Sequence, residues 1–213
     1  EVSSHAIHQG RINGIDFTGG VFTNITHDHL DYHKTFKEYI DVKKKFFDGL
    51  SSDAFAITNL DDKNGMVMMQ NTKAEVLTLA IKGDADFKAK IIENQFTGLQ
   101  LKINDKDLWV KLIGDFNAYN ILSVYAVALQ LLEDELEVLT QISALNNVEG
   151  RFEYMRTTKN IVAIVDYAHT PDALKNVLKT IANIRTGNEK VITVVGCGGD
   201  RAKTKRPIMA NIA

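Results

Sequence analysis

Short apolar runs alternate with amphipathic stretches, and this alternation constrains the fold more than any other feature of the chain. Residues 19–25 (GGVFTNI), 54–58 (AFAIT) and 75–81 (EVLTLAI) are typical of buried strands. Between them, residues 35–50 repeat apolar side chains at helical spacing, and residues 62–70 predict a shorter helix. Strands that alternate with helices predict a parallel sheet covered by helices, and therefore an α/β fold.

The pattern changes in residues 86–113, where apolar and polar positions alternate and polar turns interrupt the run at 97–98 and 104–107. These runs predict antiparallel hairpins attached to the parallel body. Residues 117–132 and 133–145 then predict two helices.

A second unit follows a loop at residues 146–152 that could join two domains. Residues 160–168 and 190–200 predict strands, and residues 172–184 predict the helix between them. This order is the start of a βαβ unit.

Charge and composition exclude several classes of partner. The net charge is -2, from 25 basic and 27 acidic residues, so the chain lacks the basic surface of a nucleic-acid-binding protein. The single cysteine, Cys197, cannot form an internal disulfide, and no apolar run reaches the roughly 18 residues of a membrane span. The first residues also lack the features of a signal peptide. We therefore expect a cytoplasmic location, no membrane insertion, no nucleic-acid partner and a monomer.

The segment NITHDHLDYH, residues 24–33, holds three of the six histidines and two aspartates. Imidazole and carboxylate groups are common ligands of divalent cations, so the segment predicts a metal site. The alternative is that these polar groups only bond one another and the nearby backbone in a tight loop.

One metal-dependent alternative is a hydrolase. His27, His29 and Asp31 fit the H-x-H-x-D pattern of binuclear zinc hydrolases similar to metallo-β-lactamases. The pattern then fails, because in that family a histidine directly follows the aspartate to bind the second metal, and here that residue is Tyr32. Only His169 follows the cluster, too few for the further ligands that a dinuclear centre needs.

The opening segment EVSSHAIHQGR and the later Lys43 give the histidine segment a more specific context. Taken in this order, EVSSHAIHQGR and NITHDHLDYH resemble the Mur ligase family, the ATP-dependent enzymes that build the peptide of bacterial peptidoglycan. The match is closest to the branch that adds a diamino acid to UDP-N-acetylmuramoyl-alanyl-glutamate.

The resemblance implies roles for individual residues. It assigns Glu1 and His29 to a Mg²⁺ site beside the ATP phosphates, and it matches Lys43 to a lysine that is carbamylated in the family. A carbamate offers an oxygen ligand suited to a hard cation, whereas the sequence alone would also allow Lys43 to be a solvated surface lysine. The positions matched to contacts with the UDP-muramoyl-dipeptide are Ser3, Gln9 and Arg11.

The segment GDFNAYN, residues 114–120, resembles the family's asparagine motif at a helix start. The resemblance implies that Asn117 and Asn120 face the adenine of ATP. An asparagine at a helix start can equally be an N-cap, and both roles remain open for Asn117. In GRFE, Arg151 matches an arginine near the nucleotide phosphates at the domain junction, and with Lys43 and His29 it completes the predicted catalytic set.

VDYAHTPDAL, residues 165–174, resembles the start of the family's C-terminal domain. The resemblance places Asp166 near the nucleotide ribose and turns Tyr167 and His169 toward the cleft. Thr170 and Pro171 also suit a plain helix entry, with threonine as the cap and proline at the first position.

GCGGDRAKTKRP, residues 196–207, resembles a basic motif that borders the family's active site. Arg201, Lys205 and Arg206 match it, but Ala202 replaces the usual acidic residue and removes any ion pair made there. Cys197 in this segment is interpreted as a packing residue, because no partnered base for a nucleophile can be identified.

The resemblance spans the chain and implies a domain division. Residues 1–149 would be the later part of the central ATPase domain, with a parallel sheet and a small antiparallel one, and residues 150–213 the first part of a Rossmann-like C-terminal domain. No Gly-Lys-Thr/Ser motif occurs, so the triphosphate cradle is missing and we expect this fragment alone to be inactive and not to bind ATP stably. Within the family, a folylpolyglutamate or cyanophycin synthetase relative is the alternative.

Overall fold

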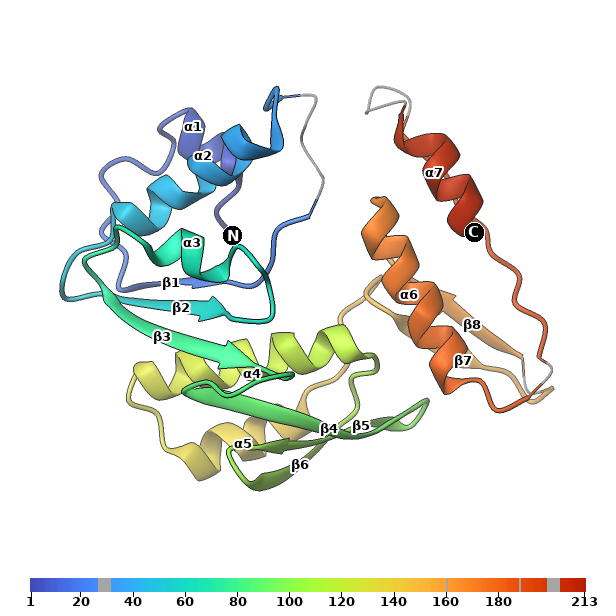
Figure 1. Cartoon of the computed structure of the whole chain (residues 1–213). Coiled ribbons are helices and arrows are strands. Elements are labelled where there is room, and N and C mark those ends of the chain that lie inside the picture. Colours follow the sequence, from blue (N-terminus) through green and yellow to red (C-terminus); the bar gives the residue numbers. More distant parts are fainter. Residues whose placement is uncertain (27–31, 160, 188, 199–203) are drawn as a thin grey trace.

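The computed structural model describes residues 1–26, 32–159, 161–187, 189–198 and 204–213 (Figure 1). A six-stranded sheet keeps its strands in chain order, with the first four parallel and the last three joined by antiparallel pairing. This arrangement confirms the predicted parallel body with attached hairpins. The strands are β1 (Gly19–Phe22), β2 (Phe55–Asn59), β3 (Glu75–Ala80), β4 (Phe87–Gln95), β5 (Gly98–Ile103) and β6 (Lys106–Val110).

Helices cover both faces of the parallel strands (Figure 1). Along β2, Ala56 packs in one core cluster with α2 (Phe36–Asp48) and α3 (Gly65–Met69). The next residue, Ile57, points to the opposite cluster with α4 (Asp115–Gln130) and α5 (Glu135–Ala144). Burial on both faces explains why these strands read as continuous apolar runs.

The local signals in the sequence fix where elements begin. Thr35 caps α2, since its hydroxyl accepts a hydrogen bond from the Glu38 amide at 3.1 Å. Asn104 and Asp105 form the two-residue turn between β5 and β6 with φ of 43° and 69°, the conformation that a tight hairpin requires. The opening segment, expected as a loop, contains the short helix α1 (Ser4–His8).

The second unit begins with an antiparallel hairpin of β7 (Glu153–Arg156) and β8 (Val162–Val165). The sequence reading missed β7. The helix α6 (Pro171–Ile184) follows, capped by Thr170 with Pro171 in its first turn, which confirms the predicted helix entry. The chain then reaches α7 (Lys205–Ile212). None of the described helices is both long and apolar enough to cross a membrane.

The strand predicted at residues 190–200 is wrong for its described part. Residues 190–198 form no ladder, while β8 pairs with β7. The apolar side chains there stay exposed, with 87% of Ile192 and 94% of Val194 accessible to solvent. A strand exists only through hydrogen bonds to a neighbour, so an apolar β-branched run is not sufficient. The βαβ start is therefore not formed by the described residues.

Candidate functional site

A hollow of about 340 Å³ lies where α1, α2 and the end of β1 meet. Glu1, Thr23, Asn24 and Lys43 contribute its polar groups, and aromatic side chains of α2 help to line it. His27, His29 and Asp31 follow this end of β1 in the sequence and lie outside the described residues. Glu1 and Lys43, predicted from the resemblance to share a metal site, do lie at the same hollow.

The three consecutive lysines of α2 have different surroundings. Lys44 pairs with Asp48 at 2.5 Å, and Lys45 is exposed. Lys43 is half-buried, with its Nζ 5.5 Å from the centre of the Tyr39 ring. Burial lowers the pKa of Lys43, and the Glu1 carboxylate only partly opposes this shift. Lys43 is therefore not the freely solvated lysine that the sequence alone allowed.

The residues predicted to contact the UDP-muramoyl-dipeptide all belong to α1 or the turn after it. Ser3 caps α1, because its hydroxyl accepts a hydrogen bond from the Ala6 amide at 3.1 Å. Gln9 ends the helix and donates to the Tyr32 hydroxyl at 3.4 Å, and Arg11 is exposed. Ser3 thus has a structural role that would accompany any substrate contact.

His33 has a packing role. The residue is fully buried, its Nε2 lies 2.9 Å from the Ser4 hydroxyl, and its ring stacks on Tyr39 at 5.4 Å. His33 therefore joins α1 to α2 behind the hollow. Within the described ranges, no group of three or more histidine, cysteine or acidic side chains could hold a metal ion.

The asparagine motif lies at the start of α4. The N-cap position is occupied by Gly114, so Asn117 is not the N-cap. Its side-chain Nδ2 instead donates to the Ile113 carbonyl at 2.8 Å. Its Oδ1 accepts from the side-chain Nδ2 of Asn120 at 3.1 Å. The two asparagines are thus brought together on one helix face, where Asn120 is exposed.

Four of the predicted nucleotide contacts meet at the start of the second unit. The Arg151 guanidinium lies 4.8 Å from the centre of the Tyr167 ring, and the His169 ring lies 5.2 Å from Tyr167. Asp166 accepts hydrogen bonds from the amides of Phe152 at 2.8 Å and Ala168 at 2.7 Å. These bonds fix the carboxylate and its neighbours as one surface group.

Aromatic packing joins this group to α4. The ring of Phe116, beside Asn117, lies 6.2 Å from the buried ring of Phe152, and both belong to one small core with Ile113 and Ile184. The start of α4 therefore lies against the start of the second unit.

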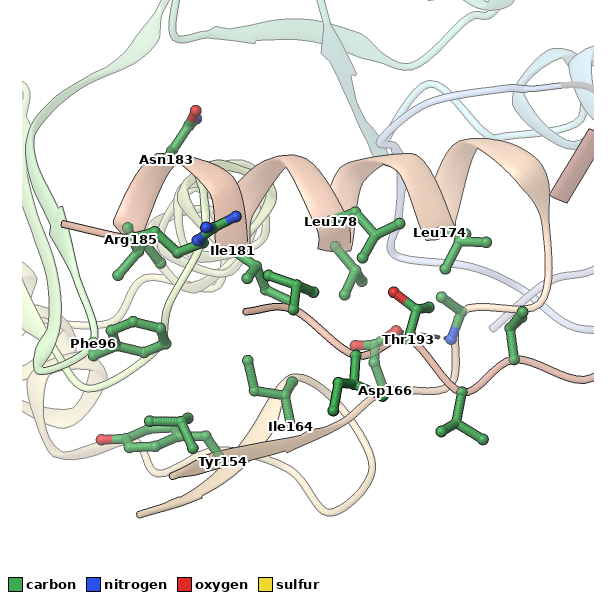
Figure 2. Close-up of a pocket in the computed structure, with 18 of the residues that line it drawn as sticks. Phe96, Tyr154, Ile164, Asp166, Leu174, Leu178, Ile181, Asn183, Arg185 and Thr193 are labelled. Carbon is green, nitrogen blue, oxygen red and sulfur yellow. Dashed lines mark hydrogen bonds between the residues drawn. The ribbon is translucent and has the colours of Figure 1, made fainter. Parts of the chain in front are cut away.

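A larger hollow of about 1580 Å³ lies between α6, the β7–β8 hairpin and residues 190–198. Figure 2 shows Leu178 and Ile181 of α6 facing Ile164 and Tyr154 of the hairpin, with Asp166 at the same space. The lining combines these apolar side chains with cationic ones, among them Arg156, Arg185 and Lys190. Cys197, at its edge, is exposed rather than packed inside, although its Sγ lies 3.7 Å from the Met209 Sδ.

The basic motif near the end is only partly described. Arg201 and Ala202 lie outside the described residues. Lys205 begins α7, and Arg206 donates to the Gly198 carbonyl at 3.4 Å.

The sequence reading missed a polar turn at residues 59–62. Asn59 is the last residue of β2, Asp61 and Asp62 follow it, and all three bond to segments far away in the sequence. A signal was present, because NLDD follows a buried strand and ligand sites in α/β sheets lie at the carboxyl ends of strands.

Two family models match the chain. The Mur ligase middle domain matches residues 1–128, and the glutamate ligase domain of Mur ligases matches residues 150–213. Both models describe parts of ligases, which favours the ligase interpretation of the sequence over the zinc hydrolase.

Curated relatives and solved structures agree with these models. A UDP-N-acetylmuramoyl-L-alanyl-D-glutamate–2,6-diaminopimelate ligase of Cytophaga hutchinsonii is 57% identical over 213 residues, which are 100% of this chain and 44% of that protein. The enzyme of the same description from Listeria monocytogenes is 43% identical, again over 100% of this chain and 45% of that protein. The chain therefore spans less than half the length of these relatives.

A solved structure of a ligase of that description matches with a TM-score of 0.75 and 31% identity, over 100% of this chain and 45% of the other. The UDP-N-acetylmuramate–alanine ligase of Thermotoga maritima matches with a TM-score of 0.64 and 23% identity, over 80% of this chain and 39% of the other. This second similarity extends to the fold alone.

Proposed function

The chain belongs to the Mur ligase family, and from this premise we propose that it forms part of an ATP-dependent ligase that lengthens the peptidoglycan peptide. The substrates would be UDP-N-acetylmuramoyl-L-alanyl-D-glutamate and 2,6-diaminopimelate, which the names of its relatives give for those proteins. These names also favour diaminopimelate over lysine, a choice that the sequence left open.

The reaction would be amide formation through an acyl phosphate. A carboxylate oxygen of the D-glutamate attacks the terminal phosphorus of ATP, and the bond from that phosphorus to the bridging oxygen breaks to release ADP. The free amine of the diamino acid then attacks the acyl carbon, the carbon–oxygen bond to phosphate breaks, and the amine loses a proton. Phosphoryl transfer of this kind depends mainly on positioning and charge neutralisation.

We propose that the hollow beside Lys43 is the metal and phosphate end of the site. Bound Mg²⁺ would neutralise charge on the transferred phosphoryl group. Oxygen atoms of Glu1, Thr23 and Asn24 line the hollow and suit a hard cation. The proposal also keeps His29, which lies outside the described residues, as a ligand.

Carbamylation of Lys43 would complete this donor set. Only the neutral amine of a lysine reacts with carbon dioxide, forming a nitrogen–carbon bond and releasing a proton. The lowered pKa of Lys43 favours that neutral form, whereas the Lys44 amine lies 2.5 Å from the Asp48 carboxylate and does not line the hollow. The single observation that carries the proposal is this half-buried amine beside the Glu1 carboxylate.

The opposite end of the site would hold the base and ribose. We propose that Asn117 and Asn120 contact the adenine and that Asp166 approaches the ribose. Arg151, Tyr167 and His169 would border the nucleotide at the domain junction. The contacts of Phe116 with Phe152 support this proposal, because they place the start of α4 against that junction.

Substitution of Lys43 by arginine tests the proposed function in the natural protein that carries this sequence. Arginine keeps the positive charge but cannot form the carbamate, so we expect ligase turnover to fall about a hundredfold. The matched control is Lys45→Arg, two residues away and exposed, which should keep full turnover. Carbon NMR with isotopically labelled bicarbonate should show a carbamate signal that only Lys43→Arg removes. Full turnover in Lys43→Arg would contradict the assignment.

A further inference from the structure

The turn at residues 59–62 connects the end of β2 to the end of β1. Asn59 is only 5% exposed, and its Nδ2 donates to the Thr23 carbonyl at 2.8 Å. Its Oδ1 accepts from the Asp61 amide at 2.9 Å, which closes the turn on itself. Asn59 therefore joins the exit of β1 to a turn that is already fixed.

Asp62 makes a second bond to the same exit. Its Oδ2 accepts from the Ile25 amide at 2.9 Å, and its Oδ1 accepts from the Asn64 amide at 2.8 Å. The following helix starts directly against the turn, since a Cβ on Gly65 would lie 2.2 Å from the Asn59 carbonyl oxygen. The turn is thus held from behind by α3 and has little room to move.

Asp61 extends the network in the opposite direction. Its Oδ2 accepts from the amides of Ile81 at 2.7 Å and Lys82 at 3.1 Å, and from the Tyr119 hydroxyl at 2.8 Å. Burial alone would raise the pKa of Asp61, but these three hydrogen bonds hold it below its ordinary value. Burial and the neighbouring carboxylate raise the pKa of Tyr119, so its hydroxyl stays a donor at neutral pH.

The ends of this network lie at the two halves of the proposed nucleotide site. Thr23 lines the hollow with Lys43 and Glu1. Tyr119 lies on α4 between Asn117 and Asn120. We propose that the 59–62 turn is a positioning element that fixes the β1 exit relative to the start of α4. It thereby sets the distance between the phosphate end and the base end of the site. This inference rests on the proposed function.

Positioning of this kind has a measurable effect because phosphoryl transfer tolerates little misplacement of its groups. Hydrogen bonds to carboxylates are also stronger than neutral ones, so the connections made by Asp61 and Asp62 should be stiff. Loss of one connection should change the binding of the part of the nucleotide at that end. A residue with a merely structural role would change stability without this selectivity.

The base end is tested by Tyr119→Phe in the natural protein that carries this sequence. We expect a rise in KM for ATP of about three- to tenfold, with an unchanged KM for the UDP-muramoyl-dipeptide. The matched control is Tyr125→Phe on the same helix, which removes a similar bond of 2.5 Å to Glu135 on the side of α5. This control should leave both KM values unchanged.

A double-mutant cycle links the tyrosine to the proposed base contact. If Tyr119 acts by placing Asn117, Tyr119→Phe should have little further effect on KM for ATP once Asn117→Ala is present. Additive effects of the two substitutions on KM for ATP would show that Tyr119 does not act by placing Asn117.

The phosphate end is tested by Asp62→Asn, which keeps the shape of the side chain but removes an acceptor. We expect the Mg²⁺ concentration for half-maximal turnover to rise about threefold or more. In the metal-free protein, hydrogen exchange at the Ile25 amide should accelerate. The matched control Asp86→Asn weakens a bond of 2.8 Å to the Thr78 amide and should change neither quantity.

The outcomes separate this inference from the function on which it rests. If the unsubstituted protein ligates but Tyr119→Phe and Tyr125→Phe have equal KM values for ATP, the inference alone is overturned. An unchanged Mg²⁺ requirement in Asp62→Asn would also overturn it. Absence of ATP-dependent ligation in the unsubstituted protein would overturn both the proposed function and the inference.

Discussion

The two parts of the molecule use similar apolar sequences with different results. In β5, Ile103 is fully buried, because strands flank it on both sides and α4 and α5 cover one face. In the second unit, Ile192 belongs to an equally apolar run but is 87% exposed. The difference shows that neighbouring elements, and not apolar composition, decide whether a run becomes a buried strand.

Polar groups also differ between the first part of the molecule and the second unit. After β1 and β3, the backbone amides of Ile25 and Ile81 donate to Asp62 and Asp61. In the second unit, Arg185 and Glu189 form a half-exposed pair at 3.8 Å at the edge of the larger hollow. The first part is therefore organised by buried and half-buried interactions, and the second mainly by its small aromatic core.

The largest expected effect separates the two isoleucines. Ile103→Ala should lower the free energy of unfolding by about 2–5 kcal/mol, because it opens a cavity in a packed core. Ile192→Ala should change it by less than about 0.5 kcal/mol, because the side chain is already in solvent. Urea denaturation followed by circular dichroism measures both. Equal losses would show that residues 190–198 are packed after all.

A smaller effect on stability concerns Lys43 in the better-packed first part. Burial of its amine lowers the pKa of this residue. The unfolded chain keeps the ordinary value of 10.5, so between the two pKa values the unfolded state binds more protons and stability rises with pH. Below the lowered pKa, Lys43 is charged in both states, and the folded state carries the full free-energy cost of burying that charge. In buffer free of carbon dioxide, Lys43→Met should therefore raise the melting temperature at neutral pH.

The advantage of Lys43→Met should shrink as pH rises toward 10.5. The exposed Lys45→Met serves as its control and should show no such dependence. A Lys43→Met advantage that stays constant with pH would mean that the amine carries no burial penalty.

The smallest effect compares two carboxylates. Hydrogen bonds from Lys106 and Tyr125 lower the pKa of Glu135, so its contribution is complete above the ordinary value of 4.5 and is lost as pH falls through the lowered one. Glu135→Gln should cost less than about 1 kcal/mol at neutral pH, since the pair is half-exposed. This cost of Glu135→Gln in unfolding free energy should vanish below the lowered pKa of Glu135, where the carboxyl group is protonated.

Glu189→Gln gives the matching measurement in the second unit. Glu189 lies in an exposed loop, and we expect its substitution to change the unfolding midpoint less than Glu135→Gln does. A larger change from Glu189→Gln would reverse the comparison between the two parts.

Much of the fold was predictable from local signals. Thr35 and Thr170 begin their helices, and Asn104 and Asp105 form the hairpin turn, because capping and positive φ depend on a few neighbouring residues. The missed helix α1 and strand β7 are short, and short elements carry too few periods to be recognised. The strand predicted at residues 190–200 failed because pairing is not a local property.

The functional site was also predictable only in part, because its geometry depends on contacts between distant segments. Sequence motifs named Glu1, Lys43, Asn117 and Arg151, and the structure places Glu1 and Lys43 at one hollow and Arg151 against Tyr167. The sequence alone could not show that Lys43, rather than Lys44 or Lys45, faces the hollow, because a shift of one residue turns a helical side chain by about 100°.

The sequence by itself determined the order of strands and helices along the main sheet, the capped starts of α2 and α6, and the residue types available for binding. Only the tertiary structure decided which lysine lines the hollow, which apolar run stays unpaired, and that Tyr119 meets Asp61 across 58 positions. The physical reason is that capping and turns depend on neighbours in the chain, whereas desolvation and hydrogen-bond partners depend on neighbours in space.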